Sequence, residues 1–496
     1  MTSSLIRGRP RHATGHIGVR VGHAVLGGVT GALWLVLPVM TTTAQDPVPV
    51  AAREPVAAAR ADGASTADYV MPLVAVAAAG ALGGYGYVRR VRRSRSRTTP
   101  GIVSAAPPTP SPVDVERQAR SALVLADDCV RTSREALGYV DGGDLALAAL
   151  RAAETELSAA FAIWRRYEEG IPGDDTGRRQ ALVGVVGRCA EAGRQLDAAA
   201  EGFDAEWDAG DALAVAEGRF RELAARTGGV ASALAEAAER YGSGAVAAVV
   251  GHVEQAKDRL VFATGRLNRA RQDADSGDGD GFRRGLRAAE GAVAQAGVLL
   301  DGVARLAAEL RTAAGLVPAA LTGAEAELAG VRAPVSPARL AHADTVLAAV
   351  REELTGGPYD PLDALRRVVR AVEGTGGGRS GVTAAGADLV ARSALGAAED
   401  FVGVHRGAVG AEARALLAEA GRSASAGASA DADRLARRAR ELAGRDVRAH
   451  GNPYAGEAAH ESGLAGAVLG GVLLGEEGDG GPVVAFGGPE TRARLG

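Results

Sequence analysis

Along the middle of the chain, apolar residues recur at alternating intervals of three and four, which places them on one stripe of an α-helix. The spacing does not drift over long stretches, and this is the a/d pattern of a coiled-coil seam. Four such runs occupy residues 182–207, 213–241, 246–270 and 282–310. Each run predicts a helix of several turns.

Glycines and prolines mark the breaks between these predicted helices. The breaks lie at residues 171–177, 241–244, 276–281 and 356–361. Because they are short, we expect consecutive helices to be antiparallel neighbours. Further helices are predicted at residues 337–354, 361–373, 382–420 and 430–448, with a flexible joint at 374–381.

Strand-like alternation of useful length is absent from the sequence. The predicted fold class is therefore all-α: a transmembrane helix followed by long antiparallel helical hairpins or a segmented coiled-coil bundle, with a disordered linker and a Gly-rich tail.

Residues 69–88 are uncharged throughout and long enough to cross a bilayer as a helix. Tyr69, Tyr85 and Tyr87 lie near its ends, where amphipathic rings prefer the membrane–water interface. Arginines crowd residues 89–97 directly after this segment, and the positive-inside rule assigns them to the cytoplasm. We therefore predict a protein of the cell membrane whose helical region is cytoplasmic, with residues 45–68 as a short extracytoplasmic segment.

Residues 1–44 have a basic start, an apolar stretch and a small-residue end at Ala44. That is the layout of a secretory signal peptide cleaved after Ala44. The apolar stretch is longer than most signal cores, so an uncleaved first transmembrane segment also fits it. Cleavage gives a single-pass protein and retention a two-pass protein, and the helical region is cytoplasmic in both.

Three further segments complete the predicted organisation. Residues 89–112 hold the Arg cluster and a Pro-rich linker, which is expected to be extended and semi-rigid. Residues 113–450 form the helical, coiled-coil domain. The Gly-rich tail at 451–496 is predicted to be largely disordered, in contact with the membrane or a partner, and its apolar piece at 463–475 is too short to span a bilayer.

Composition narrows the range of functions. Aromatic residues make up 4% of the chain against 47% hydrophobic residues, so the predicted core is thin and built from Ala, Leu and Val. A deep pocket lined by aromatic side chains is correspondingly disfavoured. The net charge is −4, with basic and acidic residues interleaved, whereas nucleic-acid binding needs a concentrated basic face. We expect no nucleic-acid partner.

The sequence contains no recognisable catalytic, cofactor or metal motif. Cys129 and Cys189 are spaced like their apolar neighbours, which favours buried thiols over a redox or metal role. The acidic stretch at 273–280 resembles a calcium loop but lacks its closing Glu, so an acidic connection between helices is favoured. The glycines of 374–380 lack the Lys of a phosphate loop. His252 and His405 are interpreted as half-buried polar residues within helices.

Five segments resemble actinobacterial TPM-domain-containing membrane proteins. They are residues 251–264 (GHVEQAKDRLVFAT), 359–367 (YDPLDALRR), 405–410 (HRGAVG), 446–454 (DVRAHGNPY) and 486–494 (FGGPETRAR). In that family a signal peptide and an extracytoplasmic TPM domain precede the membrane span and the helical region. Here only residues 45–68 stand in the place of the TPM domain, so we expect it to be absent. The resemblance therefore implies no phosphatase or ion-binding activity.

These observations favour a membrane-anchored cytoplasmic scaffold or interaction protein without a catalytic site of its own. Its expected partners are the membrane and either another protein or a second copy of the chain, bound through helices. We expect no cofactor and no small-molecule substrate. The alternative is an enzyme or enzyme subunit, hydrolase-like, with a site on its helices that the sequence does not reveal.

Overall fold

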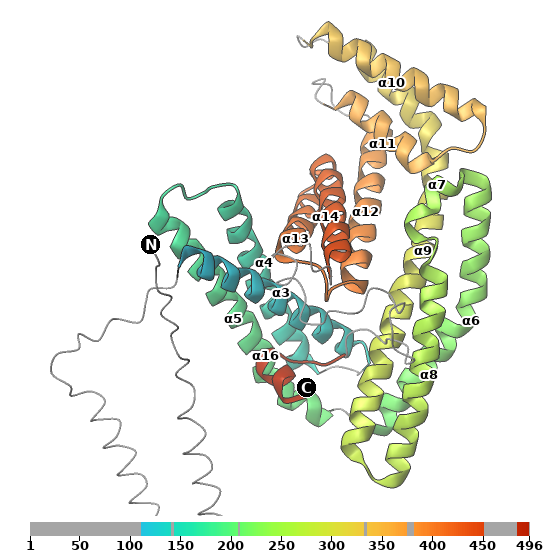
Figure 1. Ribbon diagram of the computed structural model, residues 1–496. Helices are drawn as coiled ribbons and strands as arrows, with labels where there is room; N and C mark the ends of the chain where they lie inside the picture. The colour runs from blue at the N-terminus through green and yellow to red at the C-terminus, as the bar shows by residue number, and fades with distance from the viewer. Residues whose placement is uncertain are drawn as a thin grey trace, which may run out of the picture. The chain divides into compact units, whose positions relative to one another are not determined.

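The computed structural model describes residues 111–139, 143–206, 209–331, 335–373, 381–450 and 484–495. The predicted signal segment, the span at 69–88 and the glycines of 374–380 lie outside these ranges. Within the described residues every regular element is a helix and none is a strand, which confirms the all-α fold class (Figure 1).

The described helices occur in the chain in the order of their labels. Their bounds are α3 Pro112–Leu137, α4 Asp144–Glu168, α5 Asp175–Glu206, α6 Ala209–Tyr241, α7 Ser243–Val246, the 3₁₀ turn η1 Ala247–Val249, α8 His252–Ser276, α9 Gly279–Ala329, α10 Pro337–Gly356, α11 Pro361–Val372, α12 Gly381–Val404, α13 Ala411–Ser425, α14 Ser429–Ala449 and α16 Pro489–Leu495. Consecutive pairs such as α4 and α5, α8 and α9, and α13 and α14 pack against each other.

Local chemistry sets where several helices begin. Ser111 caps α3 because its hydroxyl accepts the backbone N–H of Asp114, and Pro112 occupies the first turn, where no N–H is needed. Asp360 caps α11 in the same way, since one carboxylate oxygen accepts the N–H groups of Leu362 and Asp363. The predicted break at 356–361 therefore ends at Pro361, which is the first residue of α11.

One predicted helix, residues 382–420, is wrong: the structure breaks it into α12 and α13. Residues 405–410 form a turn between them, and Asp446 on α14 accepts the backbone N–H of Gly410 at 2.9 Å. Arg406 lies in this turn, and its guanidinium donates two hydrogen bonds to the carboxylate of Glu135 on α3. Helical periodicity in this stretch gives no sign of the break, because the interactions that hold the turn come from distant helices.

The prediction of a disordered tail is wrong for residues 484–495. Val484 and Phe486 are buried among the apolar residues of α3, α4 and α5, and Phe486 stacks on Phe203 with ring centroids 4.6 Å apart. Asp197 on α5 accepts the backbone N–H and the hydroxyl of Thr491 at the start of α16. The Phe203–Phe486 stack and the Asp197 carboxylate thus hold residues 484–495 against α5, although their composition predicts disorder.

α9 is the longest helix of the described chain and the neighbour of α6, α8, α10, α11 and α12. By length and composition it is also the one described helix apolar enough to cross a membrane, but 56% of its apolar window is buried within the fold. Leu286, Leu300 and Leu310 are completely buried against the surrounding helices. This burial is typical of a core helix, which needs no lipid to cover its apolar surface.

Four apolar clusters make up the core of the described residues, and alanines contribute heavily to all of them. Small side chains let helices approach closely but leave each contact with little apolar area to bury. Buried ion pairs supplement these contacts. The most enclosed is that of Arg414 on α13, whose side chain is fully buried and reaches Asp127 and Asp128 on α3, the latter at 2.8 Å.

Replacing Arg414 should strongly destabilise the protein. In the Arg414→Met variant Asp127 remains buried with Arg131 as its remaining ionic partner, so we expect the free energy of unfolding to fall by about 3–5 kcal/mol. Arg434→Met is the matched control on α14, because the pair of Arg434 with Asp431 is exposed and should cost no more than about 1 kcal/mol. Urea denaturation of the full chain followed by circular dichroism measures both, and equal losses would contradict a special role for Arg414.

Candidate functional site

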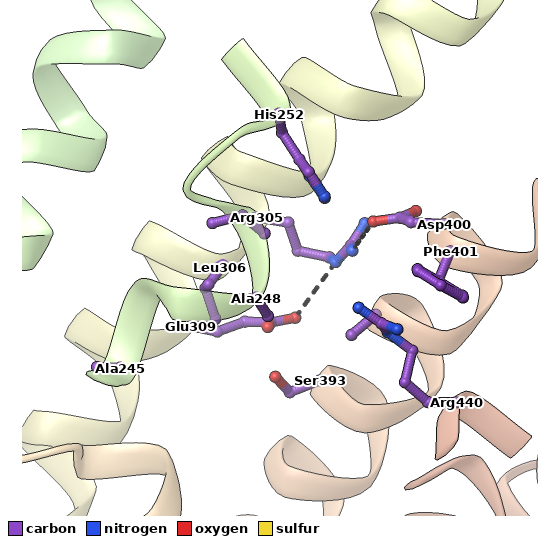
Figure 2. Close-up of a pocket in the computed structure, with 13 residues that line it drawn as sticks. Ala245, Ala248, His252, Arg305, Leu306, Glu309, Ser393, Asp400, Phe401 and Arg440 are labelled. Atoms are coloured by element: carbon purple, nitrogen blue, oxygen red, sulfur yellow. Dashed lines mark hydrogen bonds and ion pairs between the residues drawn. The ribbon is translucent and has the colours of Figure 1, made fainter. Parts of the chain in front are cut away.

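A cavity of about 80 Å³ lies where the start of α8 meets α9, α12 and α14. Figure 2 shows His252, Arg305, Asp400, Ser393 and Arg440 arranged around one space. Alanine, valine and leucine side chains from α7, η1 and α9 complete the lining. The cavity therefore combines an apolar wall with a cluster of charged and polar groups.

Arg305 is the central cation of this cluster. Its guanidinium donates to Asp400 on α12 and lies 3.8 Å from Glu309, one turn further along α9. Gly302 and Gly396 make room for the pair: a Cβ at Gly302 would lie 2.7 Å from the carboxylate of Asp400, and one at Gly396 would lie 2.8 Å from Nε of Arg305. The two glycines allow α9 and α12 to enclose an ion pair.

Burial changes the protonation of the carboxyl groups here. It raises the pKa of Asp400, and the hydrogen bond and charge of Arg305 only partly reverse the effect. Burial also raises the pKa of Glu309, against the opposing influence of Ser393 and Arg305. Both carboxyl groups thus hold a proton more readily than exposed ones.

His252 and His405 stand close together beside the cavity. Burial and the neighbouring Arg440 and Arg305 lower the pKa of His252 to about 4. Burial, Arg440, His252 and Arg259 lower the pKa of His405 to about 4 as well. Both imidazoles are therefore neutral at physiological pH. Each can donate one hydrogen bond and accept another without carrying a charge.

Phe401 contacts both His405 and Arg440. The ring of His405 lies 4.5 Å from that of Phe401, and the guanidinium of Arg440 lies 3.5 Å from the Phe401 ring centroid. Arg440 also lines a second, open cavity of about 520 Å³ on the surface of α14, with Arg438, Arg445 and Arg448. One arginine thus borders both the inner cavity and a basic surface groove.

The structure places the other residues considered from the sequence away from this cavity. Cys129 and Cys189 are buried free thiols, as predicted, and burial raises the pKa of Cys189 to about 12, which leaves it protonated. The acidic stretch at 273–280 connects α8 to α9, and Asp278 caps α9 by accepting the N–H of Gly281. Among the described residues no group of His, Cys, Asp and Glu is arranged to hold a metal ion.

One of the segments that carry the TPM-family resemblance lines the cavity, a second contacts a residue of its lining, and a third is hydrogen-bonded to the second. The segment 251–264 supplies His252, the segment 405–410 supplies His405, and Asp446 of the third fixes the turn through Gly410. The segments at 359–367 and 486–494 form the start of α11 and the docked C-terminal piece instead.

The sequence gives no sign that Arg305, Glu309, Asp400 and Arg440 lie together. Asp400 is 95 positions from Arg305, and only tertiary packing brings the two together. The closest signal in the sequence is the pair of glycines one turn from these charges, Gly302 and Gly396, because a glycine within a helix often marks a close approach of another group.

The fold and the cavity define an all-α protein with an alanine-rich core and an enclosed charged cluster. Two curated proteins are similar to it: UPF0603 protein MT2410 of Mycobacterium tuberculosis (strain CDC 1551 / Oshkosh) and UPF0603 protein Rv2345 of M. tuberculosis (strain ATCC 25618 / H37Rv). Each is 28% identical over 415 residues, covering 74% of this chain and 62% of the relative. The chain thus spans about three fifths of the length of these relatives. No protein-family model matches the chain, and no solved structure does so significantly.

The two histidines should make the protein less stable in mild acid. An unfolded histidine has a pKa near 6.5, whereas the folded values are about 4, so the unfolded chain binds more protons between these limits and stability falls as the pH drops through them. His252→Gln should lose less stability than the native chain between pH 6.5 and 4.5. His342→Gln, at an exposed position on α10, should follow the native curve. Urea titrations at several pH values test this, and a native-like slope in His252→Gln would contradict it.

Proposed function

We propose that the protein is a membrane-anchored cytoplasmic scaffold, in which residues 69–88 form the anchor and residues 113–450 present helical surfaces to a protein partner or to a second copy of the chain. The successive helix pairs act as a segmented coiled-coil bundle. The TPM-family resemblance supports the same arrangement of anchor and helical region.

The observation that supports this proposal is the set of buried or half-buried ion pairs that join different helices. Arg406, Arg414 and Arg305 pair with carboxylates on other helices, at Glu135, Asp127 and Asp400. Arg366 and Arg370 on α11 similarly share Asp433 on α14. Charges held in this way fix helices relative to one another. In a chain with a thin core, these ion pairs hold the helices in fixed positions, so that their outer faces form a constant surface for a partner.

The exposed side of the helices offers apolar contacts for a partner. Leu145 at the start of α4 is 81% exposed and Val261 on α8 is 73% exposed. Single exposed apolar residues are common, but an interface needs such anchors within a polar rim. Exposed ion pairs also lie on these helices: Lys257 pairs with Glu254 on α8, and Glu154 of α4 pairs with Arg134.

The alternative function is an enzyme with a hydrolase-like site, and the cavity of Figure 2 is the observation that favours it. Glu309 and Asp400 have raised pKa values beside neutral His252, which is a combination that general acid–base catalysis uses. The cavity of about 80 Å³ is small for a substrate, so the scaffold is the favoured function.

Membrane fractionation and crosslinking of the tagged full chain test the scaffold. The protein should sediment with membranes, and deletion of residues 69–88 should release it into the supernatant. Crosslinking in membranes should capture a defined partner or a dimer, and an epitope reporter fused after Arg97 should report the cytoplasmic side.

A hydrolase substrate panel applied to the full chain provides the opposing test. Turnover that is lost in Glu309→Gln and retained in the exposed control Glu239→Gln would contradict the scaffold and establish the enzyme. A reporter after Arg97 that faces the exterior would overturn the placement of the helical region.

A further inference from the structure

The cavity is lined by two arginines, Arg305 and Arg440, and by two carboxylates, Glu309 and Asp400. Arg305 is held by Asp400 and Glu309, so two carboxylates serve that single cation. Arg440 enters from α14 on the other side of the cavity (Figure 2). No described residue gives the Arg440 side chain a hydrogen bond or an ion pair, and its contact is the face of Phe401.

The Arg440 side chain is half-buried, and it lines both the inner cavity and the open groove on α14. Burial lowers the pKa of Arg440, and no opposing carboxylate counters this effect. Arginine has five N–H donors in a fixed planar arrangement that matches the oxygens of a carboxylate or a phosphate. An acceptor with more than one oxygen would match the donors of Arg440.

The same cavity offers further polar groups. The Nδ1 atom of His252 is buried and has no hydrogen-bond partner. The hydroxyl of Ser393 lies at the opposite side of the cavity on α12 and is buried (Figure 2). Apolar side chains, among them Leu306 and Val249, form the remaining wall. Such a lining suits a small polar ion with several oxygens, and the volume of about 80 Å³ exceeds the space that one water molecule needs.

We propose that this cavity binds a small oxyanion, either inorganic phosphate or the carboxylate of a small acid, with Arg440 as its ionic partner and His252 and Ser393 as neutral hydrogen-bonding groups. The proposal is independent of the scaffold function, because it concerns a ligand held within the fold rather than a partner on its surface.

The groove on α14 provides a route for such an anion. Arg438, Arg445 and Arg448 line it together with Arg440, and Glu441 is the one acid in its lining. Arg438 lies 3.3 Å from that Glu441, so the remaining arginines give the groove a positive surface. Clefts lined by one sign of charge raise the local concentration of the opposite ion. Arg440, which lines both the groove and the inner cavity, then binds the anion.

Thermal unfolding and isothermal titration calorimetry of the full chain test the proposal, with sodium phosphate, sodium acetate and sodium chloride compared at matched ionic strength and neutral pH. Phosphate, acetate or both should raise the melting temperature above that in chloride, because a ligand that binds the folded state stabilises it. Stabilisation by phosphate alone identifies a phosphate site, and stabilisation by acetate identifies a carboxylate site.

Three variants localise the binding. Arg440→Met keeps an apolar stem over Phe401 and removes the charge, so affinity should fall by about tenfold to a hundredfold, the effect of losing a hydrogen bond to a charged group. Arg440→Lys keeps the charge and should retain part of the binding. Arg438→Met is the matched control, since it lines the groove but not the inner cavity and should bind as the native chain does.

Two results would overturn the proposal. If phosphate and acetate stabilise no more than chloride, the cavity holds only water. If Arg438→Met loses as much affinity as Arg440→Met, or Arg440→Met binds normally, the anion is attracted by the surface groove and not by the cavity. Circular dichroism of each variant checks that the helical fold is intact, and Arg440→Lys preserves the test if Arg440→Met unfolds.

Discussion

Arg414 holds two parts of the described fold together through one fully buried guanidinium. It reaches Asp127 and Asp128 on α3, and it also donates to the backbone carbonyls of Val409 and Arg406. A single side chain therefore fixes both the neighbouring helix and the turn that ends α12. Burial pushes the pKa of Asp127 upward, but Arg131 and Arg414 outweigh it and hold this pKa below its usual value. The charge pair persists because each of its members has more than one partner.

The need for such pairs follows from composition. A core of alanines gains little from each helix contact, so much of the specificity of packing has to come from directional interactions. Arg406 with Glu135 and Arg305 with Asp400 repeat the pattern at other helix junctions. Arg440 departs from it, since no described carboxylate forms an ion pair with its guanidinium, which lies over the ring of Phe401. The proposed oxyanion would give this last arginine the partner that the others find within the chain.

Much of the fold could be predicted from the sequence, and little of the site could be. The three-and-four spacing and the glycine and proline breaks placed α11 correctly and found the greater part of α8, because those features act locally. The predicted run at 246–270 begins before α8, in α7 and η1, and the run at 282–310 covers only part of α9, which continues to Ala329. The break between α12 and α13 and the docking of Phe486 depend on Asp446, Glu135 and Phe203, which are far away in the sequence. His252 and His405 are half-buried, as predicted, but His405 lies in the turn after α12 and not within a helix, and the proximity of Arg440 to both was not predicted.

Amide hydrogen exchange of the full chain, native and Arg414→Met, tests most directly whether buried ion pairs join the helices. Arg414 lies on α13, and its carboxylate partners lie on α3. We predict that the variant loses protection in both helices together and in the turn at residues 405–410, while the more distant pair α8 and α9 keeps its protection. Loss confined to α13 would contradict the account, because it would mean that the apolar contacts alone hold α3 in place.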